Sequence, residues 1–196
     1  MSKAIEENLS LELVREWVIA SHMDLAKVKQ MLAEHPSLLN AAYPWKEDDN
    51  ETAIQAAAQM GNAPMAEYLL SKGAPMEICT AAMLGRKQEV EHMLGQDANK
   101  ITATGAHGIP LLVHAALSGN LELVRLLYGK GATQGVSFAF HSAVSRDDVP
   151  MSKWFLENSK PDLKWKDFQG KTALTVATEK GYRELAQLLQ PPQTSA

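Results

Sequence analysis

Short apolar segments alternate with glycine-containing turns along most of the chain. Within the segments the apolar residues recur at i, i+3 and i+4 spacing, which predicts short amphipathic helices with one buried face each. The clearest example covers residues 170–189, GKTALTVATEKGYRELAQLL, where Gly181 separates two such stretches. The pattern therefore predicts pairs of short helices that are joined by a glycine turn.

The helix pair of residues 170–189 has fainter copies elsewhere in the chain. Equivalent glycines follow apolar stretches at Gly61, Gly85 and Gly119, and a pair of alanines precedes each of them. Neither helix of a pair can bury its apolar face alone, so a neighbouring pair must cover it. We therefore expect a continuous stack of helix pairs, which offers a surface to a partner rather than a pocket to a substrate.

These copies resemble the repeats of ankyrin proteins. The family pattern is Asp-x-x-Gly-x-Thr-Pro-Leu-His-x-Ala-Ala-x-x-Gly, followed by a second helix that ends Leu-Leu-x-x-Gly-Ala, with a period of about 33 residues. The Thr-Pro-Leu-His tetrapeptide is never intact in this chain, but many other positions fit in register. The matching residues are Thr52, Ile54, Ala57, Ala58, Gly61, Leu69, Leu70, Gly73 and Ala74, then Gly108, Leu112, Ala115, Ala116, Gly119, Leu126, Leu127, Gly131 and Ala132, and finally Asp167, Gly170, Thr172, Leu174, Ala177 and Gly181.

The resemblance implies an all-α ankyrin solenoid of about six stacked helix-turn-helix units. We expect one domain over residues 1–190 and a flexible tail over residues 191–196. Two copies leave almost no room for a hairpin finger between helix pairs, so full-length fingers are expected only at about 41–52, 99–110 and 161–172. The expected repeats are about 11–40, 41–74, 75–98, 99–132, 133–160 and 161–190, of which the third and fifth are shortened.

Polar residues and prolines predict where the terminal helices begin and end. Ser10 is expected to cap a helix that runs to about Ser21, and Asp24 is expected to cap the next helix. Pro36 should end that second helix, and the prolines at 191–192 should stop the last one.

Composition narrows the classes of partner. The 196 residues carry a net charge of −4 without a Lys/Arg-rich run, which argues against nucleic-acid binding.

A single cysteine, Cys79, excludes an intrachain disulfide and fits a reducing compartment. The polar start lacks a signal core, and no apolar stretch approaches the roughly 18 residues that a membrane span needs. We therefore expect a cytoplasmic protein that does not enter a membrane.

The sequence does not favour catalysis. Adjacent carboxylates occur at residues 6–7, 47–49 and 147–148, but these lie in expected loops or at the polar terminus, where water keeps them ionised. No phosphate-binding glycine loop, nucleophile elbow or zinc-protease motif is present. We expect no enzyme activity and no cofactor.

A metal or small-ligand site that uses His114, His141 and Cys79 is the alternative. The two histidines fall near equivalent places in consecutive copies, with the cysteine one copy earlier. The resemblance favours structural roles instead: a histidine at the place of His141 usually bonds to backbone, and the place of His114 is dominated by packing. His22, His35, His92 and His107 lack a partner at zinc-ligand spacing.

The resemblance also implies where a partner binds, namely at finger tips and at the ends of the first helix of each pair. An apolar strip of four of these residues (Met60, Met83, Leu84 and Leu117) is expected to be exposed, unless the missing fingers let it pack against neighbouring loops. Trp45 and Phe168 are expected to act as aromatic anchors, whereas Trp154 and Trp165 are expected to be buried. The predicted contact residues are Trp45, Gln59, Met60, Met83, Leu84, His107, Ile109, Leu117, Arg146, Phe168 and Lys171.

The leading hypothesis is a non-enzymatic scaffold or adaptor that binds a protein of unknown identity through the concave face of the solenoid. A monomer is expected, or a weak homodimer in which the apolar strip forms the seam.

Overall fold

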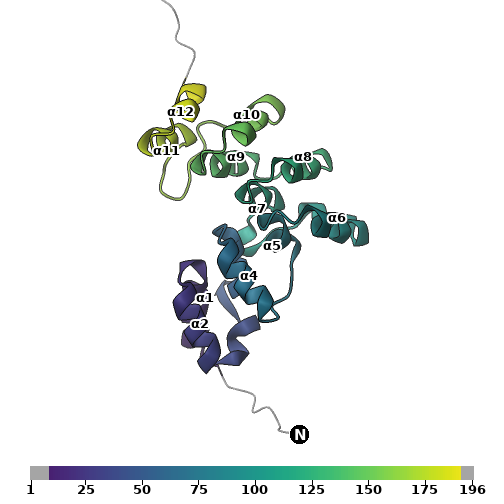
Figure 1. Ribbon diagram of the computed structural model, residues 1–196, viewed down its shortest axis with the longest axis vertical. Helices are drawn as coiled ribbons and strands as arrows, with labels where there is room; N and C mark the ends of the chain where they lie inside the picture. The colour runs from purple at the N-terminus through teal and green to yellow at the C-terminus, as the bar shows by residue number, and fades with distance from the viewer. Residues whose placement is uncertain (1–8, 191–196) are drawn as a thin grey trace, which may run out of the picture.

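The computed structural model describes residues 9–190 as a succession of stacked helix pairs, running from α1–α2 at one end to α11–α12 at the other (Figure 1). Its twelve α-helices confirm the expected six pairs and the all-α class. The helices are α1 Leu11–Met23, α2 Leu25–Glu34, α3 Ala53–Gln59, α4 Ala63–Ser71, α5 Ile78–Met83, α6 Lys87–Gln96, α7 Leu111–Leu117, α8 Leu121–Gly129, α9 Val136–Ser145, α10 Val149–Asn158, α11 Ala173–Glu179 and α12 Arg183–Leu189.

Three of the connections between pairs are long enough to form fingers. The first contains the 3₁₀ helix η1 (Pro36–Asn40) and an antiparallel hairpin of β1 (Ala42–Lys46) and β2 (Asp49–Thr52). The second contains the 3₁₀ helices η2 (Ala98–Thr102) and η3 (Ala106–Gly108) and closes with a bridge between Thr104 and Pro110. The third closes with a bridge between Lys166 and Thr172. By contrast, only residues 72–77 separate α4 from α5, and only residues 130–135 separate α8 from α9.

The first two helices begin at the residues that the sequence indicates. The Ser10 side chain accepts a hydrogen bond from the Leu13 amide at 3.2 Å, and the Asp24 side chain accepts one from the Lys27 amide at 2.9 Å. Helix α1 continues slightly past its expected end, to Met23. The prolines at 191–192 and the tail to residue 196 lie outside the described residues.

An asparagine after the turn glycine joins successive pairs. Gly61 and Gly119 adopt left-handed φ values of +66° and +74°, which a residue without Cβ reaches at no steric cost. The side chain of Asn62 caps α4 and donates to the His22 carbonyl oxygen at 3.0 Å. Asn120 likewise caps α8 and donates to the Gly85 carbonyl oxygen at 3.1 Å. Each asparagine therefore satisfies its own helix start and ties it to the preceding turn.

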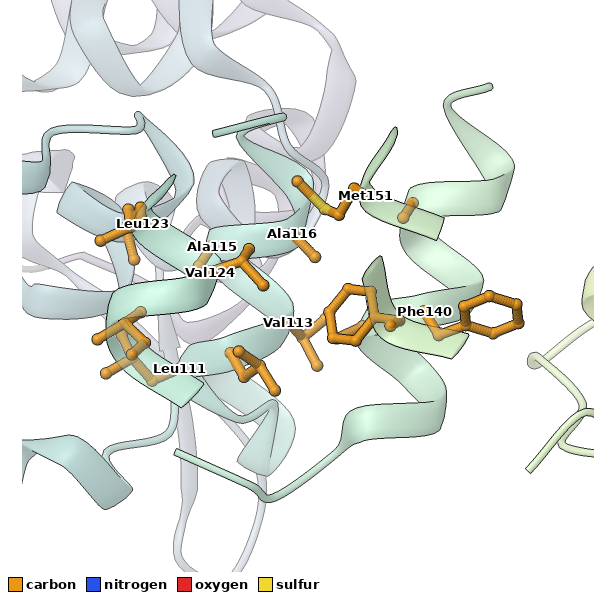
Figure 2. Packing of buried hydrophobic residues seen from close by; sticks show 14 of the residues in the cluster. Leu111, Val113, Ala115, Ala116, Leu123, Val124, Phe140 and Met151 are labelled. Carbon is orange, nitrogen blue, oxygen red and sulfur yellow. The ribbon is translucent and has the colours of Figure 1, made fainter. Parts of the chain in front are cut away.

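The first helices of the pairs pack against one another along the stack, α1 on α3, α3 on α5, α5 on α7, α7 on α9 and α9 on α11. We call α1, α3, α5, α7, α9 and α11 the inner helices, and the second helix of each pair the outer helix. Two apolar clusters fill the interior, one over α1–α4 and one over α5–α12. In the second cluster, side chains such as Val113, Phe140 and Met151 fill the space between α7, α9 and α10 (Figure 2).

Candidate partner-binding face

The second finger reaches back to the first because the repeat between them has no finger of its own. His107, in η3, lies against β2, and its left-handed backbone (φ +57°) turns it toward the hairpin. Its amide donates to Asp49 Oδ1 at 3.0 Å, and its Nδ1 donates to Asp49 Oδ2 at 2.9 Å. This double contact joins residues that are 58 positions apart and holds the two fingers together.

The hydrogen bond from His107 also changes the acidity of Asp49. It stabilises the ionised carboxylate and lowers the pKa of Asp49 below its ordinary value of 3.8, against an opposing effect of burial. Lys46 Nζ lies 3.7 Å from Asp49 Oδ2 and acts in the same direction.

A buried carboxylate, Glu51, lies behind this contact. Its side chain has no exposed surface, and it accepts hydrogen bonds from Trp45 Nε1 at 2.6 Å and from Gln59 Nε2 at 2.7 Å. Gln59 Nε2 is also 2.6 Å from His22 Nε2, while His22 Nδ1 donates to the Val18 carbonyl oxygen at 2.9 Å. In this arrangement His22 Nε2 accepts from Gln59. The amide nitrogen of Gln59, a predicted contact residue, is therefore engaged within the molecule.

A shallow hollow opens above this network. It is lined by Ile19, His22, Met23, Trp45 and His107, and we call it the Trp45 hollow. Its rim is apolar and open to solvent, since Ile19 is 44% exposed and Met23 is 78% exposed. Sequence reasoning selected Trp45 and His107 but no residue of α1. The signal available in the sequence was the pair Ile19 and Met23, which are four residues apart and therefore lie on one helix face.

The apolar strip of Met60, Met83, Leu84 and Leu117 is not exposed as a whole. The expected exposure of Met83 is corrected. Met83 is only 2% exposed because it packs into the apolar cluster of α1–α4. Leu84 and Leu117 are half-buried against the same cluster, and the Leu117 side chain would lie 3.6 Å from a Cβ placed on Gly61. Met60, at 46%, is the one member that stays largely exposed. Three of the four members are therefore packed with the α1–α4 cluster, and only Met60 is largely exposed.

Phe168, the other expected aromatic anchor, is exposed on the third finger. Phe168 is 91% exposed in the turn before α11. The nearby Lys171 Nζ donates to Glu179 Oε2 at 2.5 Å, and this contact raises the pKa of Lys171. Arg146 is exposed at the end of α9, and Ile109 is half-buried in the second finger.

The two tryptophans that were expected to be buried are half-buried. Trp165 stacks on Phe138 with ring centroids 5.1 Å apart, and Trp154 meets Tyr128 edge-on at 5.4 Å. Both therefore pack against the stack.

The alternative site residues lie in the interior. Burial lowers the pKa of His114 to about 4 and raises the pKa of the Cys79 thiol to about 12, so the imidazole is neutral and the thiol is protonated near pH 7. Neither His114 nitrogen makes a hydrogen bond of good geometry. Backbone groups of Ala58 and Ile109 nevertheless come close enough to oppose the lowering of the His114 pKa by burial. His141 Nε2 instead donates to the Lys171 carbonyl oxygen at 3.1 Å. Within residues 9–190, no three His, Cys, Asp or Glu side chains are arranged to hold a metal ion.

None of the helices over residues 9–190 combines the length and the apolar character that crossing a bilayer requires.

Comparison with known proteins gives two matches to family models. A model described as ankyrin repeats (3 copies) matches residues 112–195, and a model described as ankyrin repeat matches residues 49–81. Together the two matches cover more than half of the 196 residues. A search of the curated proteins found no match to the chain.

Proposed function

Because the chain belongs to the ankyrin-repeat family, whose members are generally protein–protein interaction modules, we propose that it is a non-enzymatic scaffold for a protein partner. The partner would bind to the concave face, which we define as the surface of the inner helices and the fingers. The cytoplasmic location, and a monomeric or weakly dimeric state, are part of this proposal.

One observation carries the proposal: the large apolar side chains that stay exposed lie almost entirely on the inner helices and fingers. Grouped exposed apolar side chains often mark interaction sites. Within residues 9–190 they are Leu11, Ile19 and Met23 on α1, Met60 at the end of α3, Leu163 and Phe168 on the third finger, and Leu188, the sole member on an outer helix.

Because Leu188 is an exposed apolar side chain on an outer helix, it provides a matched control for a capture experiment. Immobilised protein would be incubated with extract from the source organism, and specifically retained proteins would be identified by mass spectrometry. We expect the double variant Met60→Ala/Phe168→Ala to lose most of the captured partner, because exposed apolar anchors contribute strongly to an interface and little to the fold. Leu188→Ala, on outer helix α12, should capture as the wild type does.

Two results would contradict the proposal. One is equal capture by the wild type and the Met60→Ala/Phe168→Ala variant. The other is loss of capture in Leu188→Ala alone, which would place the partner on the outer helices.

A further inference from the structure

The Trp45 hollow combines an apolar rim with a fixed aromatic ring. Ile19 and Met23 reach into solvent from α1, and Trp45 faces them from β1. The indole is held in place by its hydrogen bond to Glu51 and by the edge of Tyr43, whose ring centroid is 4.8 Å away. A side chain bound here would therefore meet an aromatic ring that is already held in position, which lowers the entropic cost of binding.

The surroundings of the hollow are acidic. The hairpin turn carries Glu47 and Asp48 in solvent, and Asp49 and Glu51 lie behind it. Lys46 is the only basic residue of the hairpin, and it already lies 3.7 Å from Asp49. A partner that approaches the hollow past this turn therefore meets the exposed carboxylates of Glu47 and Asp48.

The half of the stack that contains the hollow also carries a net negative charge. Residues 9–98 contain 13 acidic and 7 basic side chains, a net charge of −6, whereas residues 99–190 contain 8 acidic and 11 basic side chains, a net charge of +3. A separation of this kind steers a basic partner toward the first half.

Arg15 of this chain already lies over the Trp45 ring. The guanidinium carbon of Arg15 lies 5.9 Å from the centre of the Trp45 ring, within the range of a cation–π contact. Arg15 is exposed and stands one helical turn before Ile19, so an arginine side chain reaches the ring from the rim. The ring face is therefore compatible with a basic side chain beside an apolar one.

From these contacts we propose that the Trp45 hollow binds a protein segment in which an apolar side chain is flanked by lysine or arginine. The apolar side chain would enter between Ile19, Met23 and Trp45, and the basic side chains would face Glu47 and Asp48. This inference rests on the proposed function, because it assigns the chemistry of the partner to one part of the concave face.

Selection from a phage-displayed library of random peptides tests the inference on the full chain. Peptides enriched on the wild-type protein are expected to share an apolar residue next to lysine or arginine. The best peptide, synthesised with a fluorescent label, should bind in an anisotropy assay with an affinity that falls as salt is added.

Two pairs of matched variants locate the site. Met23→Ala and Glu47→Lys should each weaken the labelled peptide by roughly tenfold, the effect expected for the loss of one anchor or one charge contact. Leu188→Ala removes an apolar side chain and Glu157→Lys reverses a charge at exposed positions on outer helices, and both should leave binding unchanged. Met23, Glu47 and both control residues are exposed, and circular dichroism of each variant checks that it is folded.

The inference fails if the enriched peptides are acidic or lack basic residues, if no peptide is enriched, or if Met23→Ala and Glu47→Lys bind as the wild type does. It also fails if peptide binding is lost in Phe168→Ala instead, which would place the peptide at the third finger. These failures are distinct from failure of the proposed function, because capture through Met60 and Phe168 is measured separately with the natural partner.

Discussion

At the scale of single residues, burial of the polar side chain of His114 in the stack is energetically unfavourable. Its imidazole is 1% exposed in α7 and neither nitrogen makes a hydrogen bond of good geometry. Gly105 leaves the room for the ring, since a Cβ at that position would lie 2.6 Å from His114 Nε2 and 3.7 Å from the Cys79 Cβ. The resemblance to ankyrin repeats placed His114 at a packing position between copies, and its burial agrees with a packing role.

Burial of His114 makes the stability of the protein depend on pH. The folded protein holds this imidazole neutral down to a pKa of about 4, whereas the unfolded chain takes up its proton near the ordinary value of 6.5. The free energy of unfolding should therefore be unaffected by His114 above pH 6.5. It should fall by up to about 3 kcal/mol between pH 6.5 and pH 4.

Urea unfolding at a series of pH values measures this slope. His114→Leu should be markedly less sensitive to pH over that window than the wild type, and His141, whose pKa burial also lowers, accounts for part of the remaining slope. An unchanged slope in His114→Leu would show that this imidazole is not held neutral by the fold.

At the scale of elements, the contact between the first and second fingers is the main departure from a regular array. Asp49 in β2 accepts two hydrogen bonds from His107 in η3, across the gap that the short third repeat leaves. The finger contact fixes one wall of the Trp45 hollow, because His107 lines it.

Asp49→Asn should weaken this contact. The pKa of Asp49 is lower in the folded protein than its ordinary value of 3.8, so its contribution is present above pH 3.8 and is lost as the pH falls through the lower, folded value. At pH 7 the variant should melt a few degrees below the wild type, and the difference should shrink at pH values below 3.8. Thermal melts followed by circular dichroism measure both effects.

Glu47→Gln is the control for the loss of a charge on the same hairpin, because Glu47 is exposed. A melting temperature for Asp49→Asn equal to that of Glu47→Gln at pH 7 would argue that the finger contact adds no stability.

The elements themselves follow from local sequence, but their long-range contacts do not. Ser10 and Asp24 cap their helices as expected because capping depends on a few consecutive residues. Met83 was ambiguous because helical periodicity gives the apolar face of a helix without saying which neighbour covers it. The contact of His107 with Asp49 spans 58 residues, and no periodicity in either segment encodes it.

At the scale of the whole molecule, the boundary between the two apolar clusters falls earlier in the chain than the boundary between the acidic and the basic half of the stack. The cluster of α1–α4 lies in the acidic part of the stack, whereas the cluster of α5–α12 begins in that part, with α5 and α6, and extends over the part that is net basic. Met83 belongs to the first cluster although it stands on α5, so the two parts are joined by packing as well as by the fingers. A partner that contacts the hollow and the third finger would meet opposite charges at its two ends.

The most direct test of the central claim is an amide hydrogen-exchange footprint of the protein with its captured partner bound. The account predicts slower exchange in the fingers at residues 42–52 and 165–172 and at the ends of inner helices α1 and α3. Outer helices α4, α6, α8 and α10 should exchange as they do in the free protein. Protection confined to those outer helices, with the fingers unchanged, would contradict a partner-binding concave face.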